Sequence, residues 1–389
     1  MTRISPLLAL FVIRATGGYQ FQAVSGAAPL LAMEGYSYSQ IGLLIGAYML
    51  PGFLITVPAG VVTRTIGDIP VIATGLVLMF IGSVPMAIGA GFESLLFGRL
   101  ISGTGGLIVL MLAIKMTTDR YNGPLLSTAT GVVVTSWYAG FAAALIVSAW
   151  LATWGNARLA LVAAGLPPLI GLAALPFVGP PQTPNSGPGP NPPLPVPVPW
   201  RFTASAALCW TMMNVGFALT VGFLPAWLVA LGWDPATAGA RGSVLSWSAG
   251  AATILGGWMA DRVLGRKGAV LIGASACALC TLLLPPSAAA MPLLIATGLT
   301  FALYPAALTA QVGAATPPTA RGVVFGWYSG ASYIGLTVSP WLAGILRDAT
   351  GDPAAPIWLA AALLAAFLPA YAWFLAEVRN LSSSATARA

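Results

Sequence analysis

The chain contains no histidine and only three cysteines, and charged residues make up 6% of its 389 residues. Without histidine, the Ser-His and Cys-His pairs of nucleophilic catalysis are excluded. The cysteines, Cys209, Cys277 and Cys280, lie in apolar stretches without polar neighbours at metal-ligand spacing, so neither a disulfide framework nor a metal site is expected. We therefore predict that the protein is not an enzyme and needs no cofactor.

The scarcity of charge also excludes a water-exposed surface. A soluble domain carries roughly 25% charged residues, whereas this chain is 58% hydrophobic. A helix of about 20 apolar residues crosses the hydrocarbon core of a bilayer. Such segments recur at 6–32, 38–62, 69–90, 95–117, 125–150, 157–178, 202–230, 237–260, 268–287, 290–312, 321–346 and 356–376. The sequence therefore predicts an all-α membrane protein of about twelve transmembrane helices.

The basic residues predict how these helices are oriented, because short cytoplasmic loops are enriched in Lys and Arg. With a cytoplasmic N-terminus, the inner loops and ends carry Arg3, Arg64, Lys115, Arg120, Arg201, Arg262, Arg266, Lys267, Arg321, Arg379 and Arg388. The outer side carries only Arg158, Arg241 and Arg347. We predict that both termini are cytoplasmic, in a bacterial inner membrane. The net charge of +7 reflects this orientation and not a basic groove, so no nucleic-acid partner is expected.

A proline-rich stretch interrupts the apolar segments. Residues 179–200 are dense in Pro and Gly, which favours an extended linker outside the bilayer. A ligand for a proline-binding domain is the alternative interpretation of this stretch. The predicted organisation is a first half at 1–178, the linker at 179–200 and a second half at 201–389.

The two halves resemble each other in sequence. Both contain a Trp-Tyr-x-Gly unit at an equivalent span, beginning at Trp137 and at Trp327. Further matched pairs are Pro29 with Pro225, Gly35 with Gly232, Gly42 with Gly239, and Gly60 with Gly257. An even number of spans per half returns the chain to its starting side, so the repeats are parallel and related by an axis along the membrane normal.

A loop motif carries a resemblance to the major facilitator superfamily, in which G-x-x-x-D-R-x-G-R-R joins the second and third spans of each half. The second half matches it, with one extra residue, at Gly257, Asp261, Arg262, Gly265, Arg266 and Lys267. The first half keeps Gly60, Arg64 and Gly67 but has Thr63 at the aspartate position. Arg99, Gly103 and Gly105 are similar to the R-x-x-x-G-x-G element of the fourth span. The resemblance implies two six-helix halves that move about a central substrate site.

The loop motif predicts gating residues. Asp261 at a helix end can bind backbone donors and cations, and the neighbouring bases can hold one conformation closed. The predicted set is Asp261, Arg262, Arg266, Lys267, Arg64, Gly60 and Gly257. The alternative is that these bases serve only to orient the spans.

Charges inside the spans indicate the substrate. All nine acidic residues map to loops or span edges, whereas Arg14, Arg99 and Arg241 lie within spans. A charge in hydrocarbon is costly, and a guanidinium binds carboxylates and oxyanions through paired hydrogen bonds. We therefore expect these three arginines to bind an anion. In the alternative, Arg14 and Arg241 extend to the lipid headgroups and Arg99 holds backbone carbonyls.

Neutral polar and aromatic side chains complete the candidate substrate site. The family resemblance implies that the first, fourth, seventh and tenth spans surround the cavity, which selects Gln20, Gln22, Asn214 and Tyr304. The remaining candidates are Tyr19, Trp137, Tyr138, Trp327 and Tyr328. The two Trp-Tyr pairs suit either a two-sided aromatic cage or helix packing.

These features predict a monomeric transporter that moves a small organic or inorganic anion by alternating access. Proton coupling is disfavoured because no histidine or intramembrane acid is present to carry the proton, so exchange or uniport is expected. One alternative is efflux of amphipathic drug-like molecules or metabolites through a permissive aromatic and methionine-lined pocket. A further alternative is a sensor without transport activity.

Overall fold

The computed structural model describes residues 4–52, 54–55, 62–63, 65–89, 91–121, 124–154, 156–179, 198–317 and 320–386, and these form helices and turns without strands. The first half comprises α1 (Ile4–Met33), α2 (Tyr38–Ala47), α4 (Asp68–Ile81), α5 (Ser83–Ile88), α6 (Phe92–Arg120), α7 (Pro124–Trp154), α8 (Ala157–Ala163), α9 (Leu166–Ala174) and the 3-10 helix η1 (Leu175–Val178). The second half comprises α10 (Trp200–Ala230), α11 (Pro235–Arg262), α12 (Gly265–Leu283), α13 (Met291–Ala302), α14 (Pro305–Ala315), α15 (Arg321–Thr350) and α16 (Ala355–Thr386).

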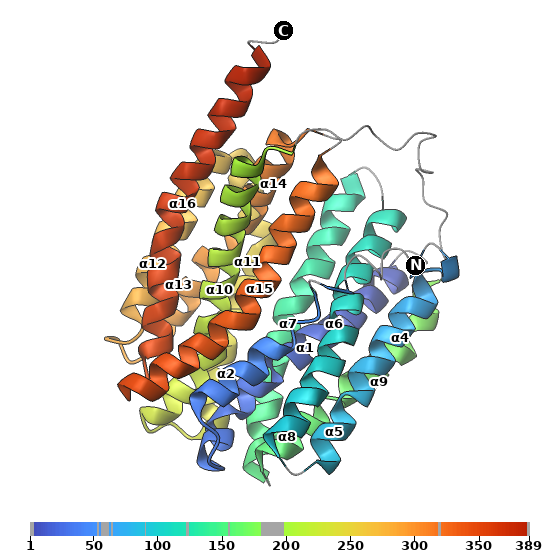
Figure 1. The fold of residues 1–389 in the computed structure, drawn as a ribbon, viewed down its shortest axis with the longest axis vertical. Helices are drawn as coiled ribbons and strands as arrows, with labels where there is room; N and C mark the ends of the chain where they lie inside the picture. The colour runs from blue at the N-terminus through green and yellow to red at the C-terminus, as the bar shows by residue number, and fades with distance from the viewer. Residues whose placement is uncertain are drawn as a thin grey trace.

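The helices form two bundles that stand side by side (Figure 1). Consecutive helices such as α4 and α5, or α13 and α14, together make single spans, which gives about twelve spans in two halves. Several spans predicted as continuous are therefore broken helices, because glycine or proline lies at the breaks, as at Gly82 and Pro305. By length and apolar composition, eight helical segments of the described chain qualify as membrane-crossing.

The two ends of the bundle carry different parts of the chain. We call the end of the bundle from which α16 projects the terminal face (Figure 1). The start of α1 lies next to the end of η1 at this face, because the Ser5 hydroxyl donates to the Phe177 carbonyl. The opposite face carries the turns after α1 and α10. Both described ends of the chain lie toward the terminal face, as expected for an even number of spans.

The repeat detected in the sequence has a structural counterpart at the opposite face. α1 and α10 both end at a glycine in the left-handed region, Gly35 and Gly232, each with a φ of +95°. The following helices begin at equivalent N-caps, Ser37 and Asp234. Hydrogen bonds from the side chain and backbone of Thr237 lower the pKa of the Asp234 carboxyl, which favours the capping carboxylate.

Close helix contacts join the halves across α2–α15 and α7–α11. Glycines make these contacts possible, because a Cβ at Gly42 would collide with the Pro340 carbonyl and one at Gly239 with the Leu145 carbonyl. These glycines lie near the starts of α2 and α11, so the two halves are packed together toward the opposite face.

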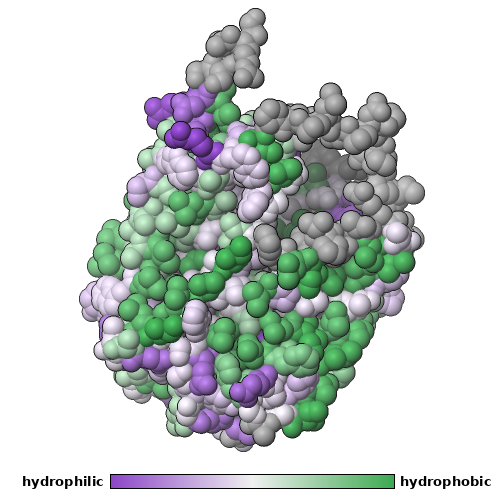
Figure 2. Space-filling view, viewed as in Figure 1, coloured by the Kyte–Doolittle hydropathy of each residue, from purple (hydrophilic) through white to green (hydrophobic). Residues whose placement is uncertain are grey.

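Hydrophobic side chains cover much of the outer surface in the view of Figure 2. On α12, large apolar side chains point outward, and Ile272 and Leu279 are 50% and 55% exposed. A contiguous exposed apolar surface of this kind suits a lipid environment and not water.

Candidate substrate site

Arg14 of α1 lies at the centre of the candidate site. Its side chain is 8% exposed, and Nη1 donates to the Val133 and Val134 carbonyls of α7, at 2.9 Å each. Its Nε has no hydrogen-bond partner within the described part of the chain. The guanidinium carbon lies 5.6 Å from the centre of the Trp137 ring. Arg14 therefore links α1 to α7 while retaining an unused donor.

Side chains from both halves surround Arg14. Tyr138 on α7 and Tyr333 on α15 lie in the wider surroundings of its guanidinium. Both tyrosines are partly exposed. Tyr333 also lies against Gly52 of the first half. The surroundings of Arg14 therefore include a tyrosine from each half of the protein, although its direct contacts are with α7.

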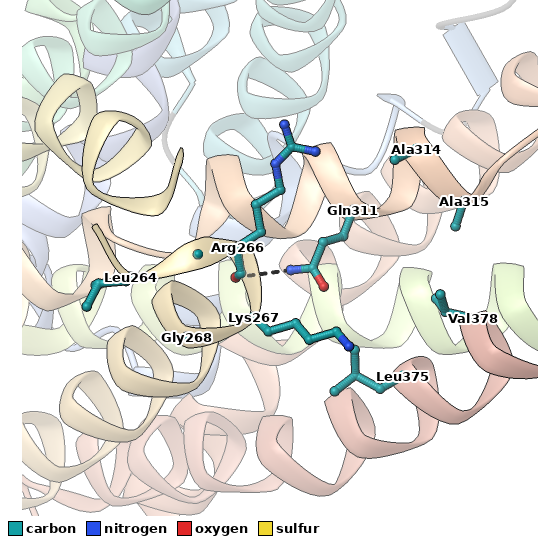
Figure 3. A pocket seen from close by; sticks show the side chains of 10 residues that line it. Leu264, Arg266, Lys267, Gly268, Gln311, Ala314, Ala315, Leu375 and Val378 are labelled. Carbon is teal, nitrogen blue, oxygen red and sulfur yellow. Dashed lines mark hydrogen bonds between the residues drawn. The ribbon is translucent and has the colours of Figure 1, made fainter. Parts of the chain in front are cut away.

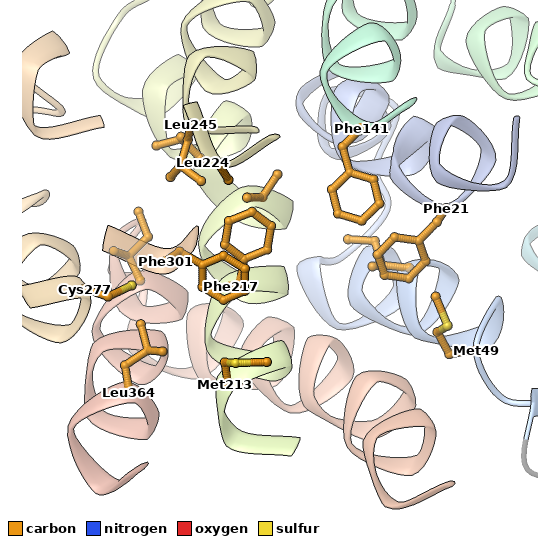
Figure 4. Packing of buried hydrophobic residues seen from close by; sticks show 14 of the residues in the cluster. Phe21, Met49, Phe141, Met213, Phe217, Leu224, Leu245, Cys277, Phe301 and Leu364 are labelled. Carbon is orange, nitrogen blue, oxygen red and sulfur yellow. The ribbon is translucent and has the colours of Figure 1, made fainter. Parts of the chain in front are cut away.

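Aromatic rings continue from the surroundings of Arg14 into each of the two bundles. In the first half, Phe21 stacks on Trp137 and Phe141, with centroids 5.9 and 5.4 Å apart. Across the interface, Tyr138 contacts Phe217 and Phe301, which stack on each other at 4.0 Å. Figure 4 shows the Phe21–Phe141 pair and the Phe217–Phe301 pair as two separate clusters, one in each bundle.

Arg99 of α6 has a different environment from Arg14. All three of its guanidinium nitrogens donate to backbone carbonyls: Nε to Leu44 at 2.9 Å, Nη1 to Gln20 at 2.6 Å and Nη2 to Phe21 at 3.1 Å. The guanidinium also lies over the Tyr48 ring, 4.7 Å from its centre. Arg99 thus fastens α1 and α2 to α6, which is the carbonyl-holding role given above as the alternative.

Arg241 lies away from both, near the start of α11 and the opposite face. Its guanidinium stacks on Trp233 at 4.1 Å and donates to the Ala289 carbonyl at 3.3 Å. Its Nε has no hydrogen-bond partner. The three predicted arginines are therefore not gathered at one place.

The neutral candidates differ in how well their polar atoms are satisfied. Gln22 is fully buried, and neither its side-chain oxygen nor its nitrogen has a partner among the described residues. Gln20 donates to the Met79 carbonyl, and only its oxygen lacks a described partner. Tyr304 is buried, and its hydroxyl lies near the Cys277 thiol. Asn214 donates to the Trp210 carbonyl within its own helix, and Tyr19 lies in a small cluster with Ala23. Buried unpaired groups such as Gln22 are costly unless water or a ligand binds them.

The two Trp-Tyr pairs are not equivalent in space. Trp137 and Tyr138 lie beside Arg14, but Trp327 is 46% exposed and packs edge-on against Trp200. Tyr328 stacks on Trp210 and shares a hydrogen bond with Thr309. The second pair therefore packs within its own half and does not mirror the first.

The predicted gating residues of the second half lie in and around the turn between α11 and α12 on the terminal face. Asp261 accepts from Nε of Arg266 at 3.1 Å, within the same turn. Arg262 and Lys267 are exposed, and Gly257 lies in α11 opposite Ala306. Gly60 and Arg64 lie outside the described residues.

A contact between the halves at the opposite face was missed by the sequence analysis. Asp348 of α15 accepts from the backbone N–H groups of Tyr38 and Ser39, at 2.9 and 2.8 Å, at the start of α2. The neighbouring Arg347 lies over the Tyr38 ring at 3.5 Å. The sequence gives no indication of this contact, because the two segments are far apart in the chain and the partners of Asp348 are backbone groups.

Among the described residues, the carboxylates form no ion pair with Arg14, Arg99 or Arg241. The ion pairs found there join Lys115 to Asp68 and Asp119, Arg201 to Glu377, and Arg266 to Asp261. None of these ion pairs includes Arg14, Arg99 or Arg241. Within the described ranges there is also no cluster of three potential metal ligands.

Known proteins resemble this chain in sequence and fold. The family model of the Major Facilitator Superfamily matches residues 10–226 and 206–389. "Inner membrane transport protein YajR" of Escherichia coli (strain K12) is 30% identical over 90 residues, which is 23% of this chain and 20% of that protein. An "MFS-type transporter" of Aspergillus terreus is 34% identical over 91 residues, which is 23% of this chain and 16% of that protein. The chain therefore aligns with a fifth or less of these two relatives.

Solved structures match over nearly the full length. The crystal structure of a D-xylose-proton symporter has a TM-score of 0.74 at 16% identity and covers 96% of this chain and 97% of its own. A bacterial homolog of the human lysosomal transporter Spinster, in an inward-facing and unoccupied conformation, has a TM-score of 0.74 at 18% identity and covers 98% of both chains. At this identity the likeness establishes the fold, and the substrate has to be argued from the site.

Proposed function

Because the chain belongs to the Major Facilitator Superfamily, we propose that it carries a small organic anion such as a carboxylate, by exchange or uniport. Transport of a small molecule by alternating access follows from the family. The charge of the substrate and the mode of coupling are the parts that we propose.

The environment of Arg14 is the observation that supports an anionic substrate. This guanidinium is buried, keeps an unpaired Nε, and lies beside aromatic side chains of both halves. Its hydrogen-bond acceptors are neutral carbonyls, so its positive charge is not balanced by a carboxylate contact. A bound anion would supply that balance through charge-assisted hydrogen bonds.

The same site supports exchange or uniport over proton symport. The chain has no histidine, and the described carboxylates that form ion pairs are paired with Lys115, Arg201 and Arg266 and not with Arg14. A transported proton needs a group that titrates in the pathway. With Arg14 as the fixed charge, the substrate itself neutralises the site during each crossing.

Orientation and conformation follow from the charge asymmetry. The positive-inside rule places the basic terminal face in the cytoplasm. In that orientation, which suits a bacterial inner membrane, the packed opposite face would be external, and close packing on that side is what an inward-facing state requires. The Arg14 site would then exchange substrate with the cytoplasm.

Efflux of amphipathic molecules is the second candidate function. The stacked Phe217 and Phe301 rings and the adjoining Tyr138 form an aromatic surface next to the interface between the halves. Aromatic and apolar surfaces of this kind bind bulky hydrophobic molecules with little regard for charge.

A thermal-shift screen of the purified full-length protein separates the two candidates. The panel should contain mono- and dicarboxylates, inorganic anions, and uncharged amphipathic compounds, because a ligand that binds the folded state raises the melting temperature by mass action. We expect a carboxylate to raise it and the same concentration of its methyl ester to have no effect. Stabilisation by amphipathic compounds alone would favour efflux and contradict the anion proposal.

A further inference from the structure

A second basic site lies at the terminal face, apart from Arg14. A pocket of about 590 Å³ opens there between α12, α14 and α16. Arg266 and Lys267 line one side, and Gln311 lines another. The opposite wall is apolar and consists of Ala314, Ala315, Leu375 and Val378. No acidic residue is present among the described residues that line it.

The pocket's cationic group is Lys267. Arg266 is already paired with Asp261 through Nε, and Gln311 is fully engaged, since it donates to the Arg266 carbonyl and accepts from the Tyr371 hydroxyl. Lys267 is exposed and has no ion-pair partner within the described part of the chain. Figure 3 shows its side chain extending toward α16, while the Arg266 guanidinium extends the other way.

Backbone geometry adds to the positive potential at this pocket. Lys267 lies in the first turn of α12, a helix of 19 residues whose first turn has no side-chain cap. The free N–H groups of a helix N-terminus and its dipole favour negative charge. The Lys267 ammonium and the start of α12 therefore act on the same space.

The pocket adjoins the lipid-facing surface. α12 packs beside α16, and one turn beyond the pocket Leu271 and Ile272 are 44% and 50% exposed. We propose that this pocket binds the phosphate headgroup of an anionic phospholipid, with Lys267 and the start of α12 on the phosphate and the acyl chains along α12. Basic pockets between transmembrane helices bind anionic headgroups in this way.

Native mass spectrometry of the delipidated full-length protein tests this site. We expect dioleoyl phosphatidylglycerol to bind at least about fivefold more tightly than dioleoyl phosphatidylcholine, and Lys267→Gln to remove most of that preference. Lys267→Arg should keep it. The matched control is Arg321→Gln, which removes an exposed cation of the same face that does not line the pocket.

Three results would overturn the proposal. The first is equal binding of the two lipids to the wild-type protein, and the second is an unchanged preference in Lys267→Gln. The third is displacement of the lipid by an equal concentration of inorganic phosphate, because the pocket would then bind free phosphate without help from its apolar wall. Lys267 is exposed, so the melting temperature of Lys267→Gln without lipid should equal that of the wild type.

Discussion

Arg99 and Arg14 are both buried guanidiniums in the first half, and they differ in what satisfies them. Arg99 donates from all three nitrogens to carbonyls of α1 and α2. Arg14 bonds α7 through one nitrogen and leaves Nε unpaired, near side chains of both halves. A guanidinium whose three nitrogens all donate within one bundle holds that bundle together, whereas one with an unpaired nitrogen near the interface is available to a ligand.

The largest expected effect tests the structural side of this comparison. Arg99→Gln removes the fork that joins three carbonyls, and each hydrogen bond made by a charged group contributes about 1.5–3 kcal/mol. We expect a low yield of folded protein and a melting temperature lower by about 10 °C, measured by fluorescence-detected size exclusion after heating. The melting temperature of Arg99→Lys should lie between those of the wild type and Arg99→Gln. The lysine ammonium keeps the charge but cannot donate to all three carbonyls as the guanidinium does. Normal stability with loss of transport alone would instead make Arg99 a substrate ligand.

Replacing Arg14 should have the reverse profile. Arg14→Gln should leave the melting temperature within about 4 °C of the wild type, because two carbonyl bonds to α7 and the contact with the Trp137 ring are lost. Transport of a carboxylate into proteoliposomes should fall about 10- to 100-fold in kcat/KM, as expected for one charge-assisted contact. Arg14→Lys, which keeps the charge, should retain part of the activity. An equal loss for carboxylates and for neutral compounds would show that Arg14 only packs helices.

The contact between Asp348 and the start of α2 extends the comparison to the interface between halves. Asp348→Asn removes the charge that faces two N–H groups of a helix N-terminus, which is worth about 1–2 kcal/mol. The protein should then populate conformations open at the opposite face about 5- to 30-fold more. Spin labels at Met33 and Thr350, at the ends of α1 and α15, would report the separation of the halves there.

A control for this measurement is available in the same loop. Asp352 accepts from the N–H of Ala354, so its contact lies within one half. Asp352→Asn should leave the distance distribution between the two labels unchanged. If Asp348→Asn also leaves it unchanged, the close glycine contacts of α2 with α15 keep the face closed without the carboxylate.

The sequence predicted what depends on local chemistry. The apolar segments predicted the helices, and the matched residues predicted the repeat of the two halves. The equal φ values at Gly35 and Gly232 agree with that repeat. The breaks within spans were missed because hydropathy does not register a change of helix at residues such as Gly82. The environments of Arg14 and Arg99 could not be separated, since both are single arginines in apolar runs and their partners are backbone carbonyls of other helices. The inequivalence of Trp137 and Trp327 was missed for the same reason, because a shared motif does not fix tertiary contacts.

Arg241 gives the smallest expected effect and sharpens the contrast with Arg14. Its guanidinium stacks on Trp233 and meets the Ala289 carbonyl within the second half. Arg241→Gln should lower stability by about 0.5–1 kcal/mol through the lost cation–π contact and change carboxylate transport by less than about twofold in kcat/KM. The measurement is the same proteoliposome assay used for Arg14. A tenfold loss would mean that the anion passes a second guanidinium near the opposite face, because Arg241 and Arg14 do not share a binding position in this conformation.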